Sequence, residues 1–174
     1  KFGKDMDHPV CPVSPLWQDT MAEICDGIAA LGANAVYFDQ ISGEPPVLCF
    51  DAAHGHPLGG GGWWVDGYQR MLNKAREAGH RRGVDLQLMG EFPAEPYMGG
   101  LNGFLIWTTR LESSIPMLTA VYSGYTSTFG TNTFFSYSDR AWIMREGREL
   151  LWGNAHGWIH PAMLLAPEHA TKGR

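Results

Sequence analysis

The sequence is short of charge, of basic clusters and of cysteine. Lysine and arginine total 13 against 18 aspartates and glutamates, and the longest basic cluster is His80-Arg81-Arg82. A basic face for nucleic acid is therefore not expected. No apolar run approaches the roughly 20 residues that cross a bilayer, so no membrane partner is expected either.

An initiating methionine and a signal peptide are also missing, since the sequence begins at Lys1. We interpret the chain as a piece of a longer protein, whose remainder is its expected partner. The compartment stays open, and a secreted or periplasmic parent protein is compatible with the sequence. With 44% hydrophobic residues over 174 positions, the chain can form one sizeable core.

Only three cysteines are present, and their spacing fits no common zinc motif. Cys25 falls within a helical pattern and is expected to pack as a small core residue. Cys11 and Cys49 lie in proline-rich loops, where they could form a disulfide, so the redox compartment stays undecided. The glycines of 59–62 lack the Lys-Ser/Thr pair that follows in a phosphate-binding loop, and no cofactor is expected.

Hydrophobic periodicity alternates along the chain between helix spacing and strand spacing. Ser14-Pro15 marks the start of the first helix, and Gly32 and Gly83 mark the ends of the first two helices. The pattern predicts helices over 16–31, 63–82 and 139–152, strands over 33–39, 84–91 and 103–107, and a strand-like region over 119–137.

This alternation favours an α/β fold with a parallel sheet, either doubly wound or closed into a barrel. Acidic residues end the first two strands, which favours the barrel because barrel active sites form at the carboxyl ends of the strands. A complete (β/α)8 barrel takes about 250 residues. The sequence therefore predicts the C-terminal portion of a TIM barrel over residues 1–166, with parallel strands and outer helices, followed by a polar tail at 167–174.

Asp39 and Glu91, which end successive predicted strands, are the candidate catalytic residues. Neighbouring parallel strands lie about 4.8 Å apart, and retaining glycosidases hold two carboxyl groups about 5–5.5 Å apart. One acid attacks the anomeric carbon, while the other protonates the leaving oxygen and later activates water. The alternative is that each acid caps the loop that follows it. Glu95 is the rival to Glu91, although its position after the strand favours a substrate-binding or loop-capping role.

The glycine- and proline-rich loop 42–62 is expected to cover the same rim of the sheet. One of its two histidines, His54 or His56, is expected to line the pocket and to form a hydrogen bond with a substrate hydroxyl, and a metal site that both form with Asp39 or Asp51 is the weaker alternative. Aromatic rings suit the apolar faces of sugars, and Trp63 is favoured because the glycines present it. The candidate substrate-binding residues are Gln40, His54, His56, Trp63, Glu95, Tyr97 and Trp107.

Four segments, VYFDQIS, CFDAAHGHPLGGGGWWVDGY, GEFPAEPYMGGLNGFLIW and WGNAHGWIHP, resemble a family of bacterial glycoside-hydrolase-like proteins. That family is catalogued largely as a domain of unknown function, and its catalytic part is a TIM barrel. The match covers about residues 10–165. The family is similar in layout to α-amylase-type glycosidases and to endo-α-N-acetylgalactosaminidases. The resemblance implies Asp39 as nucleophile and Glu91 as acid/base, without identifying the sugar.

The sequence thus predicts a glycoside hydrolase, of the retaining type, that acts on a carbohydrate substrate such as a glycan or polysaccharide. The alternative from another class is a non-catalytic carbohydrate-binding or structural barrel fragment. A weaker alternative is a metal-dependent hydrolase that uses His54 and His56. A separation above roughly 10 Å between the two carboxyl groups would favour the non-catalytic fragment.

Overall fold

The computed structural model describes residues 9–106, 115–130 and 139–157. The helices are α1 (Pro15–Ala30), α2 (Trp63–Arg81), α3 (Met117–Tyr122) and α4 (Asp139–Leu151). The strands are β1 (Ala35–Phe38), β2 (Gln87–Glu91), β3 (Gly103–Leu105), β4 (Ser127–Phe129) and β5 (Asn154–Ala155). Two single 3-10 turns, η1 (Ala52–His54) and η2 (Glu95–Tyr97), lie in the loops.

The strands form one parallel sheet in the order β1-β2-β3-β4-β5, so each strand pairs with the next strand along the chain. This confirms the predicted α/β fold and the parallel pairing of the first three strands. A doubly wound sheet reverses its strand order at a switch point, and the order seen here does not reverse. The described sheet is open, with β1 and β5 at its two edges.

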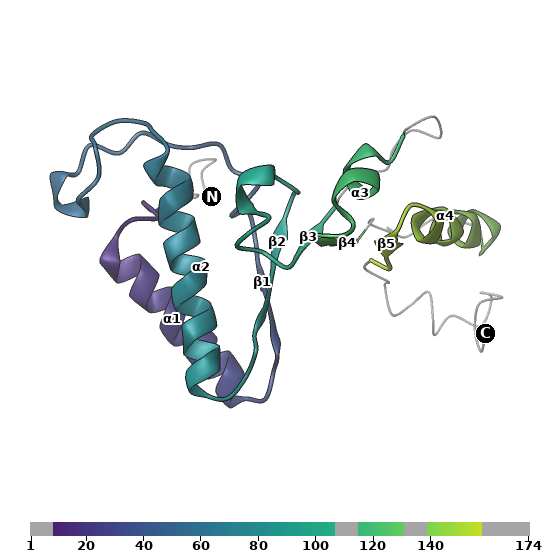
Figure 1. Cartoon of the computed structure of the whole chain (residues 1–174), viewed down its shortest axis with the longest axis horizontal. Coiled ribbons are helices and arrows are strands. Elements are labelled where there is room, and N and C mark those ends of the chain that lie inside the picture. Colours follow the sequence, from purple (N-terminus) through teal and green to yellow (C-terminus); the bar gives the residue numbers. More distant parts are fainter. Residues whose placement is uncertain (1–8, 107–114, 131–138, 158–174) are drawn as a thin grey trace, which may run out of the picture.

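Helices α1 and α2 run side by side along one side of the sheet (Figure 1). Pro15 is the first residue of α1, where its missing N–H removes no helical bond. Gly32 follows the end of the helix, and its φ of 88° allows the Ala33 N–H to bond back to the Ile28 carbonyl at 3.3 Å. Gly83, with a φ of 74°, follows the end of α2 in the same way. These glycines turn each helix into the strand that follows.

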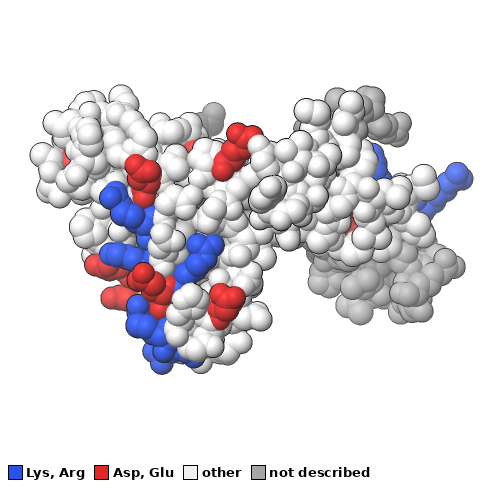
Figure 2. Space-filling view, viewed as in Figure 1, with Lys and Arg blue, Asp and Glu red and all other residues white. Residues whose placement is uncertain are grey.

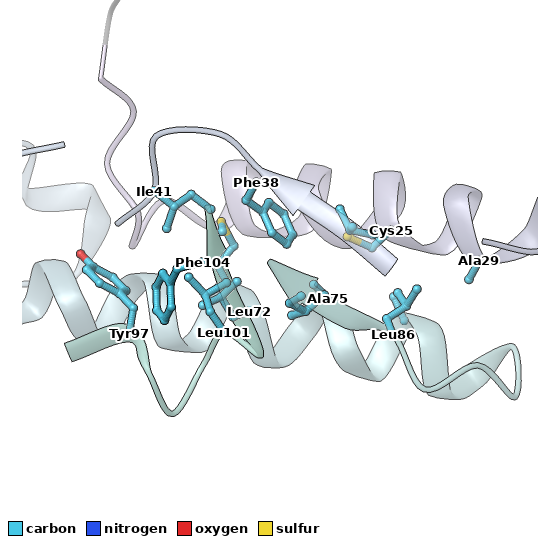
Figure 3. Close-up of a cluster of buried hydrophobic side chains, with 14 residues drawn as sticks. Cys25, Ala29, Phe38, Ile41, Leu72, Ala75, Leu86, Tyr97, Leu101 and Phe104 are labelled. Atoms are coloured by element: carbon cyan, nitrogen blue, oxygen red, sulfur yellow. The ribbon is translucent and has the colours of Figure 1, made fainter. Parts of the chain in front are cut away.

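The core lies between these two helices and one face of the sheet (Figure 3). Phe38, Leu88 and Phe104 enter it from three neighbouring strands, while Cys25 comes from α1 and Ala75 from α2. Cys25 is therefore a core residue, as predicted. Full burial of a Phe or Leu side chain contributes about 1.5–3 kcal/mol, so this layer carries much of the stability of the described fold.

Charged side chains gather over the α1–α2 layer, while the loop between β1 and α2 carries few (Figure 2). Two ion pairs join the helices: Lys74 Nζ to Asp19 Oδ1 at 2.7 Å and Arg82 Nη2 to Asp26 Oδ2 at 2.6 Å. Water and salt screen such exposed pairs, so they add little to the stability of the helix pair. Among the residues the structure describes, no helix is both long and apolar enough to span a membrane.

One element prediction was wrong. The strand-like region over 119–137 begins inside α3 and contains only the short strand β4, while residues 131–138 lie outside the described residues. Its β-branched and aromatic residues favour strands in isolation, but tertiary context overrides such preferences. Here the Pro116 carbonyl accepts both the Ala120 N–H at 2.9 Å and the Thr119 hydroxyl at 3.1 Å, which starts a helical turn instead.

Candidate active site

Asp39 and Glu91 lie at the same rim of the sheet. Phe38 pairs with Gly90 in the parallel register of β1 and β2, so the two acids occupy the next position on each strand. Side chains alternate along a strand, and Phe38 points into the helix-covered core. Tyr37, Asp39 and Glu91 are each offset by one position from Phe38 or Gly90. They therefore belong to the second face of the sheet, which is turned away from α1 and α2.

Tyr37 shares that second face with the two acids. Its hydroxyl donates a hydrogen bond to Asp39 Oδ1 at 3.2 Å. Burial, followed by the negative charges of Glu91 and Asp39, raises the pKa of Tyr37 well above its usual value. The phenol therefore stays protonated and remains a donor. Tyr37 and Asp39 are thus joined by a hydrogen bond, and Glu91 lies beside them at the end of the paired strand.

Glu91 is 3% exposed, in contrast to Asp39, which is exposed. The backbone N–H of Gln40 donates to Glu91 Oε2 at 3.2 Å, and the Ser42 hydroxyl donates to the Glu91 backbone carbonyl. Gln40 has a φ of 65°, a left-handed conformation that non-glycine residues seldom adopt. The turn that follows β1 is thus folded over the end of β2, and it covers one of the two acids.

Glu95 and Tyr97, the candidates in η2 after β2, have partners outside the acid pair. Glu95, in η2, accepts a hydrogen bond from the Tyr122 hydroxyl of α3. Tyr97 is 5% exposed and packs in the core, with its ring 6.0 Å from that of Tyr68. Its position matches a packing role. Trp107 lies outside the described residues.

In the loop 42–62, His54 and His56 lie beside Cys49 of the same loop and beside Cys11 of the segment before α1. Cys11 Sγ lies 3.3 Å from His56 Nε2, and Cys49 Sγ lies 3.4 Å from His54 Nδ1. The buried ring of Trp63 stacks on His56, with centroids 3.7 Å apart and planes 9° apart. Within the described ranges, no hydrogen bond or ion pair joins Asp39 to either histidine. The two histidines therefore form a cluster with the two cysteines and Trp63.

Two further residues of these clusters carry a signal in the sequence. Tyr37 lies two positions before Asp39 on a strand, so period-two alternation alone puts both on one face. Cys49 lies within eight residues of His54 and His56, a density of metal-binding side chains that indicates a third ligand beside the two predicted histidines. Cys11 carries no such signal, because only the packing of the N-terminal segment brings it to the loop.

The described residues form an α/β domain built on a five-stranded parallel sheet. The chain belongs to the family described as a domain of unknown function, DUF6259, whose model matches residues 1–134. The family resemblance expected from the four quoted segments is therefore confirmed.

Two relatives carry names that agree with this class. A protein of Bacteroides thetaiotaomicron named "Putative glycoside hydrolase" is 29% identical over 181 residues, which cover 95% of this chain and 25% of that protein. A protein of Monosiga brevicollis named "Putative glycoside hydrolase 22789" is 28% identical over 163 residues, covering 87% of this chain and 13% of that protein. The chain thus spans a quarter or less of the length of these relatives.

Proposed function

We propose that the chain is the part of a retaining glycoside hydrolase that carries both catalytic acids, with Asp39 as nucleophile and Glu91 as acid/base. The observation that carries this proposal is the cluster of Tyr37, Asp39 and Glu91 at the carboxyl ends of two paired parallel strands. Adjacent parallel strands are about 4.8 Å apart, which suits the about 5–5.5 Å between the carboxyl groups of retaining enzymes.

The sheet supports a barrel as the frame of this site. Its strands follow one another without a reversal, and α1 and α2 both cover the same face, as they do in a (β/α)8 barrel. We propose that β1 and β5 are completed by further strands of the parent protein. In such a barrel the second face, with Tyr37 and Met89, would turn inward, and the acids would lie at the catalytic end.

The two acids suit different tasks. Exposed Asp39 accepts a hydrogen bond from the Tyr37 hydroxyl, which orients its carboxyl group, and we propose it as the nucleophile. Glu91 is almost fully buried beneath the turn that carries Gln40, so it is shielded from water where Asp39 is not, and we propose it as the acid/base.

In the first step Asp39 bonds to the anomeric carbon while Glu91 gives its proton to the departing oxygen. In the second, Glu91 takes a proton from water, which attacks the same carbon and releases Asp39. The substrate-binding roles of Gln40, Glu95 and the aromatic residues remain predictions.

The test uses the full-length parent protein on a panel of aryl glycosides, with product stereochemistry followed by NMR. Asp39→Asn is expected to abolish turnover of every substrate, because no covalent intermediate can form. Glu91→Gln is expected to lower kcat by about 10²–10⁴ for poor leaving groups and to spare the first step for activated ones. Added azide should then restore turnover and yield a glycosyl azide of retained configuration.

Glu95→Gln is the matched control, because it removes a nearby carboxylate that the Tyr122 hydroxyl holds. If Glu95→Gln shows the azide rescue and Glu91→Gln does not, the acid/base is misassigned. Wild-type protein that binds oligosaccharides without cleaving them would instead identify a carbohydrate-binding module, the alternative from another class.

A further inference from the structure

Four metal-binding side chains meet at one point, and neither Asp39 nor Glu91 is among them. The ligand atoms of Cys11, Cys49, His54 and His56 all lie within 4.8 Å of one another. Zinc bonds of about 2.3 Å to sulfur and about 2.0–2.1 Å to nitrogen place neighbouring ligand atoms of a tetrahedron about 3.3–3.8 Å apart. The two Cys–His pairs, at 3.3 Å and 3.4 Å, already have this spacing.

Each histidine also has a partner for its second ring nitrogen. His54 turns Nδ1 to Cys49 and holds Nε2 3.4 Å from Asp51 Oδ2. His56 turns Nε2 to Cys11 and holds Nδ1 2.8 Å from the Pro57 carbonyl oxygen. A carboxylate or a backbone carbonyl on the far nitrogen is the usual partner of a metal-bound histidine, since it fixes the tautomer and the ring orientation. With the proton on that far nitrogen, each histidine would turn its other nitrogen to the same point as a ligand.

The loop has little else to hold its shape. Every residue from Gly43 to Gly62 is exposed except Cys49, His54, His56 and Gly59. Cys49 and Gly59 are bridged by two backbone hydrogen bonds of 3.1 Å and 2.7 Å, which close the segment between them. A loop without apolar burial needs another source of order, and a metal ion supplies it directly.

The fourth side chain comes from a rigidly held segment. Pro12 is fully buried, and its carbonyl accepts a hydrogen bond from Gln18 Nε2 at 2.8 Å. It also packs on α2 at Gly67, where an added Cβ would lie 3.0 Å from the Pro12 carbonyl carbon. Cys11, the preceding residue, is therefore fixed against α2 by contacts that do not depend on the loop.

From these observations we propose that Cys11, Cys49, His54 and His56 bind one zinc ion in a closed, structural Cys2His2 site. Two thiolates and two imidazoles in a tetrahedron are a donor set typical of zinc. Four protein ligands leave no open position for water, so the ion takes no part in the hydrolysis. Its role is to tie the loop after β1 to the segment before α1, and so to hold in place the loop that begins just beyond Asp39.

A disulfide between Cys11 and Cys49 is the competing arrangement of the same residues. A disulfide would also join the loop after β1 to the segment before α1, but it would not account for the orientation of either histidine. Zinc and a disulfide exclude each other chemically, since zinc needs both thiolates, so one experiment separates them.

The experiment measures metal in the full-length parent protein, purified without chelator and loaded with zinc or cobalt alone. Wild-type protein is expected to retain one more zinc per chain than Cys49→Ser or His56→Gln, and its cobalt form to show thiolate-to-cobalt charge transfer that both variants lose. Cys25→Ala and His80→Gln are the matched controls, because they remove a cysteine and a histidine outside the cluster and should retain the metal.

Two outcomes overturn the proposal. One is equal metal content in wild type and both ligand variants, and the other is a Cys11–Cys49 disulfide found by mass spectrometry without reductant. If the variants do not fold, the wild-type cobalt spectrum decides the question, because absence of thiolate charge transfer also excludes the site. The result is independent of the glycosidase proposal, since neither measurement depends on turnover.

Discussion

The backbone N–H of Gln40 donates a hydrogen bond to Glu91 Oε2 at 3.2 Å, across the gap between two strands that are far apart in sequence. The bond comes from the backbone, so it does not require a glutamine side chain. It accompanies the left-handed turn at Gln40, whose φ is 65°, and the residues after that turn bring the Ser42 hydroxyl to the Glu91 backbone carbonyl. The amide side chain is thereby left for another task, which we predicted to be substrate binding.

Gln40→Gly separates these two functions. Glycine adopts a positive φ without strain, so the turn and its bond to Glu91 should persist, and stability should change by no more than about 1 kcal/mol. We expect KM to rise because the amide is lost, while kcat stays close to that of the wild type. Gln40→Pro, which has no N–H and cannot adopt this φ, should lower both stability and kcat. Steady-state kinetics and thermal unfolding of the parent protein distinguish the two variants.

Tyr37→Phe should lower turnover without removing it. The substitution keeps the ring but deletes the hydroxyl that donates to Asp39 Oδ1. One exposed hydrogen bond to a charged group is worth about 1 kcal/mol, so we expect kcat/KM to fall about fivefold. Tyr125→Phe, whose ring is 80% exposed on the other side of β3, should leave the rate unchanged. An unaltered rate in Tyr37→Phe would show that the hydroxyl does not support the nucleophile.

The sequence predicted the acid pair because its signal is local. Apolar runs that end at Asp39 and at Glu91 mark the carboxyl ends of two strands. Parallel pairing of these strands then brings both acids to the same rim of the sheet. The loop is different, because His54 and His56 were expected to bind substrate, while their contacts with Cys49 and Cys11 were not predicted. The sequence cannot show this contact, since it depends on how the segment before α1 packs on α2.

Asp51→Asn tests the orientation of His54. The variant keeps an oxygen that can accept the Ala53 N–H, which now bonds Asp51 Oδ1 at 2.9 Å, but it loses the charge beside His54 Nε2. Loss of a carboxylate behind a metal-bound histidine typically costs 10–100-fold in metal affinity, and we expect a loss of about that size here. Competition with a chromogenic chelator measures it. Asp85→Asn is the control, because Asp85 pairs with His80 at 3.5 Å outside the cluster; an equal loss in both variants would contradict the zinc site.

Two glycines of the helical layer should respond oppositely to alanine. A Cβ at Gly79 in α2 would lie 2.6 Å from Leu86 Cγ and 2.8 Å from the Val84 carbonyl oxygen, so Gly79→Ala should destabilise by about 1–3 kcal/mol. Gly27 in α1 has open space around the same position, so Gly27→Ala should stabilise by about 0.5–1 kcal/mol through helix propensity. Denaturant unfolding followed by circular dichroism would show both shifts. Equal effects would mean that α2 does not approach the start of β2 as closely as described.

Ionisation of Tyr37 should couple stability to alkaline pH. Burial and the two neighbouring acids raise its pKa in the folded protein, while the unfolded chain ionises near the usual value of about 10. The contribution is therefore fully present below pH about 10 and is lost as pH rises through the higher folded pKa, because the unfolded state releases its proton first. We expect the Tm of the wild type to fall more steeply above pH 10 than that of Tyr37→Phe, with Tyr125→Phe following the wild type. Parallel Tm profiles for wild type and Tyr37→Phe would show that the hydroxyl does not feel both carboxyl groups, and the cluster of Tyr37, Asp39 and Glu91 would no longer support a shared site.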